Sequence, residues 1–166
     1  MIELVGLETV EANSVERLLD RAFGPDRHGR TAYRLRAGVA ALPGPSLAAC
    51  DEGALVGSIQ LWPVQFTGDD GRRVPLILVG PVAVAPDRQR DGIGRMLVAA
   101  ALARVPNEPL MLIGDPEYYG RFFGFSAEHT AGWRLPGPVE QHRLLARGDA
   151  VPTGPGSVGP RIAALA

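Results

Sequence analysis

The chain has 166 residues, enough for one domain with a substantial hydrophobic core. Its 17 Lys and Arg residues nearly balance its 18 Asp and Glu residues, so the net charge of −1 gives no indication of a nucleic-acid partner. The single cysteine, Cys50, cannot form an internal disulfide, and no apolar run approaches the roughly 20 residues of a membrane span. We therefore expect a cytoplasmic protein that binds neither nucleic acid nor a membrane.

The first quarter of the chain predicts a short edge strand and two helices. Residues 1–6 are β-prone, and residues 9–23 place apolar side chains on one helix face. A second helical piece, residues 27–36, carries five basic residues and no acidic one. Two interpretations of this basic helix stay open. It is either a solvent-exposed face, or some of its arginines contact an acidic or phosphate-bearing ligand.

A three-stranded antiparallel meander is predicted next. Residues 46–50 and 54–66 flank an Asp-Glu-Gly turn, which is typical of a hairpin. A second turn at residues 67–71 leads into a third strand, residues 72–84. Within this third strand, Gly80 followed by proline predicts a bulge.

The third strand leads into a glycine-bearing loop and then a helix. Apolar residues recur with helical spacing over residues 93–104, directly after the loop at residues 89–94. The first N–H groups of a helix have no partner within it, and its dipole places about half a positive charge there. Gly92 and Gly94 have no Cβ to hinder a close approach. The loop therefore predicts an anion-binding site.

The second half of the chain predicts a buried strand, a short helix and several late strands. Residues 109–113 are continuously apolar, as in a central strand. Asp115 is a candidate N-cap for a helix over residues 117–123. Late strands are expected from three segments, and the tail at residues 148–166 is expected to be irregular because it is rich in Pro and Gly. The three segments begin at Phe125, Gly132 and His142.

The spacing of the loop distinguishes between known phosphate sites. The P-loop pattern is absent, and the dinucleotide fingerprint lacks its third glycine. Gln89, Gly92 and Gly94 instead resemble the Q/R-x-x-G-x-G/A signature of the GNAT superfamily of N-acetyltransferases. Three further stretches, residues 61–64, 114–122 and 135–142, are similar to its YhbS-like branch.

The resemblance implies a fold and a domain organisation. The expected fold class is α/β (α+β), a GNAT-like fold with a mixed, mostly antiparallel sheet of six to seven strands and about four helices. Residues 1–166 would form a single N-acetyltransferase domain.

The resemblance also implies a donor site. Acetyl-CoA would be the acetyl donor and no metal would be needed. The loop would hold the coenzyme pyrophosphate, and a strand backbone would pair with the pantetheine arm. The residues expected to bind the coenzyme are Val82, Ala83, Val84, Gln89, Arg90, Asp91, Gly92, Ile93, Gly94 and Arg95.

A tyrosine at the start of the helix after residue 115 would protonate the departing thiolate, as in GNAT relatives. Tyr118 and Tyr119 are both candidates, and at most one can face the sulfur, because neighbours on a helix lie about 100° apart. One phenylalanine more than in many relatives, in Phe122-Phe123, leaves the choice between them open. We favour Tyr119.

No Ser-His-Asp or Cys-His spacing indicates a covalent intermediate, so direct attack by an amine is expected. The acceptor would be a small-molecule or protein amine, bound by residues 24–45 and 126–142, and a homodimer stays open. Two alternatives remain. The chain could be a non-catalytic coenzyme A-binding module or sensor, or a structural domain in which the glycines only make a tight turn.

Overall fold

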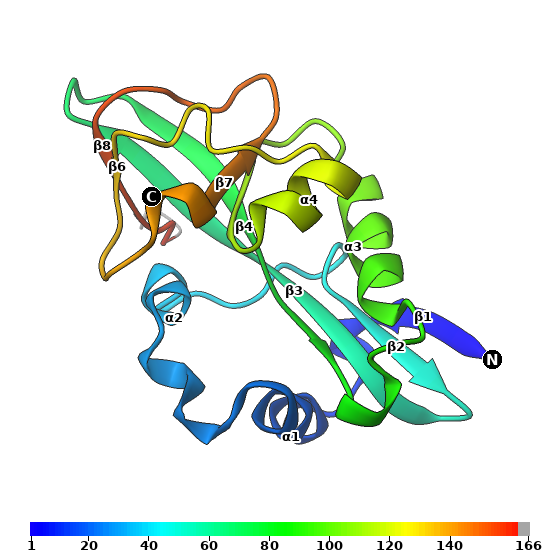
Figure 1. The fold of residues 1–166 in the computed structure, drawn as a ribbon. Coiled ribbons are helices and arrows are strands. Elements are labelled where there is room, and N and C mark those ends of the chain that lie inside the picture. The colour runs from blue at the N-terminus through cyan, green and yellow to red at the C-terminus, as the bar shows by residue number, and fades with distance from the viewer. Residues whose placement is uncertain (163–166) are drawn as a thin grey trace. The chain divides into compact units, whose positions relative to one another are not determined.

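The computed structural model describes residues 1–162 and has a mixed α/β fold (Figure 1). The helices are α1 (Ala12–Phe23), α2 (Thr31–Leu35), α3 (Ile93–Ala103) and α4 (Pro116–Phe123). The described strands are β1 (Ile2–Gly6), β2 (Leu47–Asp51), β3 (Ala54–Gly68), β4 (Arg73–Val84), β5 (Leu110–Ile113), β6 (Trp133–Arg134), β7 (Leu144–Arg147) and β8 (Gly156–Pro160).

The strands form one sheet in the order β1-β2-β3-β4-β5-β7, and β8 pairs with β3 and β6. The pairs β1–β2, β2–β3, β3–β8 and β5–β7 are antiparallel, whereas β4–β5 and β6–β8 are parallel. The predicted mixed, mostly antiparallel sheet with four helices is therefore confirmed. The described residues contain eight strands, one more than the upper end of the prediction.

The prediction of an irregular tail is wrong for β8. Val158 of this strand lies opposite Phe66 of β3, and Gly156 lies against the Phe66 ring, where a Cβ would clash. The glycines that suggested irregular structure are what allow this close approach. Residues 163–166 of the predicted tail lie outside the described residues.

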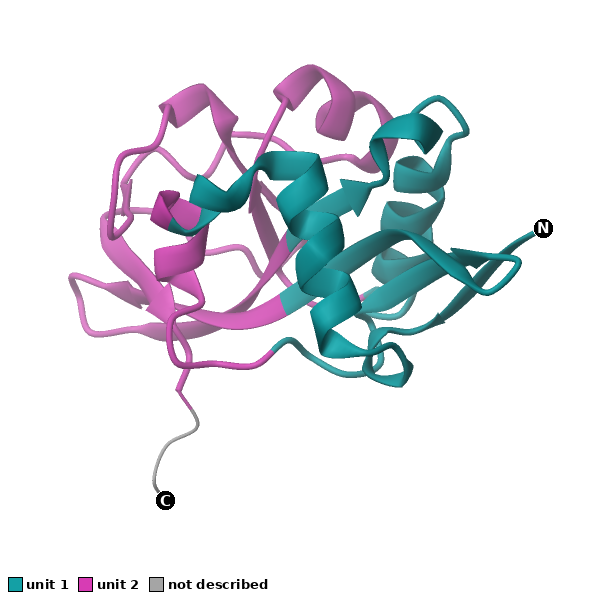
Figure 2. Cartoon of the chain, turned by 90° about the horizontal axis from the view of Figure 1, so that it is seen from below, with its two compact units in different colours: residues 1–28, 41–61, 80–106 teal, residues 29–40, 62–79, 107–166 magenta. Residues whose placement is uncertain are grey.

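The chain divides into two compact units, which Figure 2 shows in teal and magenta. Unit 1 comprises Met1–His28, Ala41–Leu61 and Gly80–Pro106. Unit 2 comprises Gly29–Ala40, Trp62–Val79 and Asn107–Ala166. The long strands β3 and β4 each contribute residues to both units.

Unit 1 has a core built on the end of β4. The apolar face of α1, including Leu18 and Leu19, packs against Ala83 of β4 and Ala85 just after it. On β3, a Cβ at Gly57 would lie 2.9 Å from Ile93 Cγ2, so α3 approaches β3 closely at this glycine. Glycine at this position sets how closely the start of α3 can lie to the sheet.

Unit 2 is stabilised by the packing of one phenylalanine ring on one tryptophan ring and by hydrogen bonds from side chains to the backbone. The Phe66 and Trp133 rings lie 5.7 Å apart, and Trp133 Nε1 donates to the Pro152 carbonyl at 3.2 Å. Thr130 Oγ1 donates to the Leu144 carbonyl at 2.7 Å. These contacts fix the long segment between α4 and β7, which has little regular structure.

The basic segment 27–36 differs from its prediction. It is a short 3-10 helix, Pro25–Gly29, followed by the five-residue α2. Arg27 is only 2% exposed, and it pairs with Glu16 and, at 3.0 Å, with Asp20 of α1. This arginine is therefore neither a solvated charge nor a ligand contact, because its ion pairs bind the segment that follows α1 to the helix itself.

Candidate active site

The side chains at the end of β4 pack within unit 1. Ala83 is 1% exposed and contacts α1. A Cβ on Gly94 would lie 3.5 Å from Val84 Cγ2 and 3.9 Å from Val82 Cγ1, so these two valines face the start of α3. A ligand at residues 82–84 would therefore contact the strand backbone rather than these side chains.

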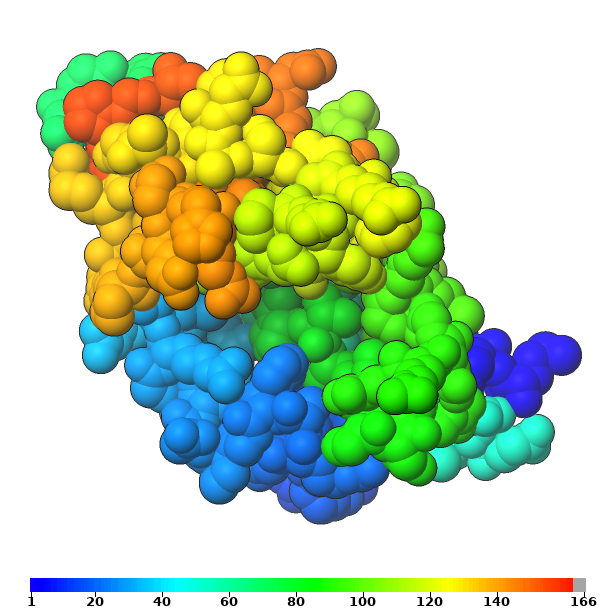
Figure 3. All heavy atoms as spheres, in the orientation of Figure 1, coloured from blue at the N-terminus to red at the C-terminus, as the bar shows by residue number. Residues whose placement is uncertain are grey.

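The loop at residues 86–92 connects β4 to α3 and lies at the surface, where it is part of the green region in Figure 3. Helix α3 begins after Gly92, and the N–H of Met96 donates to the Gly92 carbonyl at 3.1 Å. The N–H groups of Ile93 and Gly94 lie in the first turn, where no helical carbonyl precedes them. They make this helix start suitable for an anion.

Gly92 has a backbone conformation that requires glycine. Its φ is +74°, in the left-handed region, where a residue with a Cβ is less stable by about 1–2 kcal/mol. A Cβ built on it would have no heavy atom within 4 Å, so the space beside the helix start is open. The glycine thus both allows the turn and leaves room for a ligand.

The predicted side chains of the loop lie together in unit 1. Gln89, Arg90 and Arg95 are exposed. The Asp91 carboxylate instead accepts a bond of 2.6 Å from Nε of Arg88. The side chain of Asp91 is therefore occupied by an ion pair, and this residue can serve a ligand only through its backbone.

The two tyrosines lie on α4 in unit 2, and their rings meet edge to face at 4.9 Å. Tyr118 contacts Phe122 and Phe123, at ring distances of 5.4 and 5.9 Å. Tyr119 lies against Gly114, where a Cβ would come within 2.7 Å of its Cε2. The two rings therefore have partly different neighbours: both contact Phe123, but only Tyr119 packs against Gly114 at the end of β5.

Helix α4 starts as predicted. Asp115 Oδ1 accepts a bond of 3.0 Å from the N–H of Glu117, and Pro116 occupies the first helical position. Such a cap stabilises a helix by about 1 kcal/mol. The cap fixes where α4 begins and so fixes the position of Tyr119 in its first turn.

Burial raises the pKa of Tyr119 to about 12, and the nearby Tyr118 and Asp115 add smaller effects in the same direction. A phenol in such surroundings stays protonated at neutral pH. Burial and the charges of nearby residues, rather than a hydrogen bond from another described residue, account for this shift. Tyr119 is therefore a neutral hydrogen-bond donor at the end of β5.

A strand, a glycine-started helix and a tyrosine after the next strand are thus present, and comparison with known proteins shows where they belong. The model of the acetyltransferase (GNAT) family matches residues 12–125, which is more than half of the chain. The chain belongs to the GNAT family of acetyltransferases. The matched residues include every candidate site residue named above.

Solved structures support the GNAT fold. A GNAT family acetyltransferase from Brucella melitensis, in complex with acetyl-CoA, is 26% identical with a TM-score of 0.69, and the match covers 100% of this chain and 99% of that one. YhbS from Escherichia coli, in complex with CoA, is 23% identical with a TM-score of 0.68, and the match covers 95% of this chain and 88% of that one. A comparison with curated proteins finds no match.

The one cysteine of this GNAT protein is a poor nucleophile. Cys50 lies on β2 and is partly buried. Burial, and secondarily the charge of Glu3, raises the pKa of the Cys50 thiol. Since the thiolate is the reactive form, the raised pKa argues against a covalent intermediate at this residue.

The two segments expected to bind the acceptor contact each other within unit 2. Thr31 Oγ1 of α2 donates to the Pro138 carbonyl at 2.6 Å, and Arg34 Nη1 donates to the Pro136 carbonyl at 3.1 Å. Gly137 lies so close to Thr31 that a Cβ would come within 2.6 Å of its Oγ1. Arg34 thus has a structural contact, which the sequence did not indicate.

The sequence did not indicate three further features of the residues near the candidate site. Gly57 and Gly114 allow close approach by α3 and Tyr119, and the ion pair of Arg88 with Asp51 joins the loop to β2. Gly57 lies inside a predicted strand, where a glycine signals close approach, but no such signal marks Gly114, which follows its strand. The partner of Arg88 is 37 residues away along the chain, and no local pattern points to it.

Within residues 1–162, no group of three or more His, Cys, Asp or Glu side chains is placed to hold a metal ion. None of the helices in the described part of the chain is long and apolar enough to cross a membrane.

Proposed function

We propose that this chain is an N-acetyltransferase that moves the acetyl group of acetyl-CoA to a primary amine, with residues 1–166 acting as one domain. The observation that carries the proposal is the start of α3 at Gly92, where a left-handed glycine and the first-turn N–H groups lie at an exposed loop. Membership of the GNAT family supports it, as do the acetyl-CoA and CoA in the two similar structures. The cytoplasmic location stays a prediction.

The donor site follows from the geometry of unit 1. The backbone of residues 89–94 and the first turn of α3 hold the coenzyme pyrophosphate, since they offer N–H donors and the positive end of a helix dipole. The side chains of Gln89, Arg90 and Arg95 are exposed and can reach toward phosphate oxygens. The backbone of residues 82–84 pairs with the amides of pantetheine as an added strand would.

The reaction is a direct transfer. A neutral amine attacks the thioester carbonyl, the new C–N bond forms, the C–S bond breaks, and the coenzyme leaves as a thiolate. The proton of the resulting ammonium group passes to water. The raised pKa of the Cys50 thiol supports a mechanism without an acetyl-enzyme.

The sequence predicts that a tyrosine protonates the leaving thiolate, but the raised pKa of Tyr119 disfavours full transfer, so Tyr119 stabilises the thiolate by donating a hydrogen bond from its hydroxyl. Its pKa of about 12 keeps this donor neutral. Tyr118 is the alternative, but its ring lies among the phenylalanines of α4. We therefore retain Tyr119 as the residue that faces the sulfur.

The acceptor amine, from a small molecule or a protein, binds at the region made by α2 and the loop at residues 136–138. The hydrogen bonds of Thr31 and Arg34 to this loop support the idea that the two segments act together. Substitutions that loosen them should alter the KM for the acceptor more than that for acetyl-CoA.

The function is tested by incubating the protein with acetyl-CoA and a panel of amines, polyamines, amino acids and peptides with free N-termini. The proposal predicts amine-dependent release of coenzyme thiol, with an equal amount of N-acetylated product found by mass spectrometry. Binding of acetyl-CoA without any acetylated product across the panel would identify a non-catalytic coenzyme-binding module. Absence of binding would mean that the glycines only make a turn.

The donor site is tested by Gly92→Asn, with Gly71→Asn as the matched control. Both glycines have a positive φ and no heavy atom within 4 Å of a Cβ, and asparagine tolerates this backbone region better than other residues with a Cβ. Only Gly92→Asn places a side chain beside the start of α3. It should raise the Kd for acetyl-CoA by about tenfold or more, equivalent to at least about 1.4 kcal/mol. Equal affinity in both variants would refute the assignment.

A further inference from the structure

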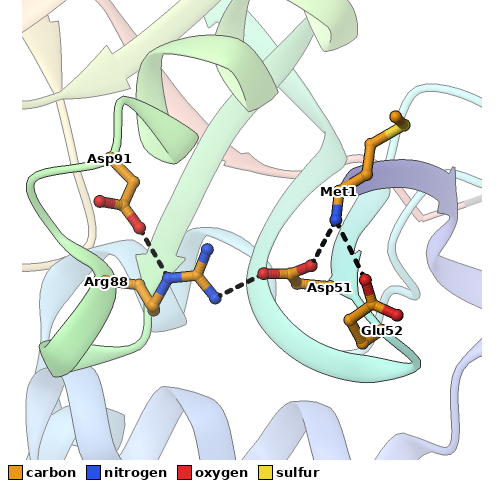
Figure 4. Close-up of polar contacts among 5 residues, drawn as sticks. All are labelled: Met1, Asp51, Glu52, Arg88 and Asp91. Carbon is orange, nitrogen blue, oxygen red and sulfur yellow. Dashed lines mark hydrogen bonds and ion pairs between the residues drawn. The ribbon is translucent and has the colours of Figure 1, made fainter.

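Arg88 lies between two carboxylates that come from different parts of unit 1 (Figure 4). Its Nη1 is 3.0 Å from Oδ2 of Asp51, at the end of β2, and its Nε is 2.6 Å from Oδ2 of Asp91, in the loop before α3. The side chains of Arg88 and Asp51 are only 27% and 23% exposed. The guanidinium thus cross-links the β2–β3 hairpin to the loop that starts α3.

Asp51 is well suited to be the fixed end of this cross-link. It also accepts a bond of 2.8 Å from the Met1 amine, which contacts Glu52 at 3.5 Å (Figure 4). Hydrogen bonds, first from this amine and then from Arg88, hold the pKa of the Asp51 carboxyl below its usual value. Asp51 therefore stays ionised throughout the neutral pH range.

The loop also has two longer side-chain contacts, Arg21 with Asp87 at 3.9 Å and Gln89 with the Val84 carbonyl at 3.5 Å. The backbone N–H of Arg88 donates to the Ala85 carbonyl at 2.8 Å, and the Arg88 carbonyl accepts from the backbone N–H of Asp91 at 3.2 Å. These two bonds close two short turns. Residues 89–92 are exposed. The Arg88–Asp91 pair therefore restrains the loop one residue before Gly92, where the helix start is set.

The same pair changes the charge that a phosphate would meet. A free Asp91 carboxylate beside the start of α3 would repel an anion, because like charges at short range disfavour each other. The guanidinium offsets this charge and is itself engaged by two carboxylates. A direct bond from Arg88 to phosphate would have to compete with both of them.

We propose that Asp51 and Arg88 are positioning residues for the donor site. Asp51 holds Arg88 in place, and Arg88 in turn holds Asp91, so that the loop keeps the conformation that binds the coenzyme pyrophosphate. This inference rests on the proposed function, since it requires that the loop binds acetyl-CoA. Neither residue touches the reacting atoms. Their effect is on the affinity for the phosphate-bearing part of the donor.

The expected result for Asp51→Asn is a rise of about fivefold in the Kd and KM for acetyl-CoA, with kcat at saturating donor unchanged. The same variant should use acetyl-pantetheine, which has no pyrophosphate, as well as the wild type does. A purely structural role would affect both donors alike. Glu52→Gln is the matched control, because Glu52 contacts the Met1 amine but not Arg88, and it should leave both donors unaffected.

A double-mutant cycle tests the path through Arg88. Arg88→Gln should raise the KM for acetyl-CoA at least as much as Asp51→Asn does, and adding Asp51→Asn to Arg88→Gln should have no further effect. The inference is overturned if Asp51→Asn leaves the KM for acetyl-CoA unchanged while Arg88→Gln raises it, since Arg88 would then bind phosphate directly. It is also overturned if the two effects multiply, or if acetyl-pantetheine is affected equally.

Failure of this inference can be separated from failure of the proposed function. If Gly92→Asn weakens acetyl-CoA binding but Asp51→Asn does not, the loop binds the coenzyme and the positioning role is wrong. If Gly92→Asn has no effect, the donor site itself is wrong.

Discussion

Replacing Tyr119 with phenylalanine removes the proposed donor and keeps the ring that packs against Gly114. The ring contacts with Phe125 and Tyr118 would persist, so the fold should change little. Among the described residues, the Tyr119 hydroxyl has no hydrogen-bond partner that the change would remove. The effect of Tyr119→Phe should therefore appear in the chemical step rather than in stability.

The pKa of Tyr119 sets the size of that effect. A thiol has a pKa of about 8.5, so full proton transfer from a phenol with a pKa of about 12 would cost about 5 kcal/mol. Tyr119 is thus a poor acid for complete transfer but a good neutral donor. A hydrogen bond to a charged group contributes about 1.5–3 kcal/mol, which corresponds to a fall in kcat of about 10- to 150-fold.

The assay compares kcat and the Kd for acetyl-CoA in wild type, Tyr119→Phe and Tyr118→Phe. Tyr119→Phe should lower kcat by the stated factor with an unchanged Kd, and Tyr118→Phe should lower it less than about threefold. The reasoning is refuted if Tyr119→Phe turns over at the wild-type rate. A large loss in Tyr118→Phe alone would show that the neighbouring hydroxyl faces the sulfur.

Three further predictions concern stability, each measured by urea unfolding. The pKa of Tyr119 is raised to about 12 from about 10 in the unfolded chain, so its contribution to the free energy of unfolding is complete below pH about 10 and is lost toward pH about 12. Tyr119→Phe should therefore flatten the fall in stability at alkaline pH, and an unchanged slope would contradict this. Gly57→Ala should cost about 1–3 kcal/mol, since its Cβ would lie 2.9 Å from Ile93 Cγ2 and 3.0 Å from Leu97 Cδ1, and a neutral result would mean that α3 shifts freely. Asp115→Ala should cost about 1 kcal/mol through loss of the α4 cap, whereas Asp115→Asn should retain most of it, and equal losses would argue against capping.

Local patterns predicted the features of the fold that depend on neighbouring residues. Helical spacing after residue 92 placed α3 within one residue of its observed end, and Asp115 followed by proline placed the start of α4. The order of strand, turn and helix also indicated that Gly92 leaves room beside the helix start, although its left-handed conformation was not predicted. Such signals are contained in one short stretch of chain.

The remaining features depend on residues that are distant in sequence. The sequence left the role of Arg27 in its basic segment open and gave no sign of an ion pair at Arg88, but each is paired with a carboxylate from another element. Strand β8 could not be predicted from its own residues, because Gly and Pro give it no hydrophobic alternation, and it is defined by its pairing with β3. The difference between Tyr118 and Tyr119 arises from burial beside Gly114, which periodicity alone cannot show.

The central claim is that the start of α3 binds the pyrophosphate of acetyl-CoA, and backbone amide NMR tests it most directly. On titration with acetyl-CoA, the amide resonances of Gly92, Ile93 and Gly94 should show the largest shifts, because their N–H groups would exchange water for phosphate oxygens. Acetyl-pantetheine, which has no pyrophosphate, should leave these three resonances nearly unmoved. Saturable binding of acetyl-CoA with no change at these amides would contradict the claim.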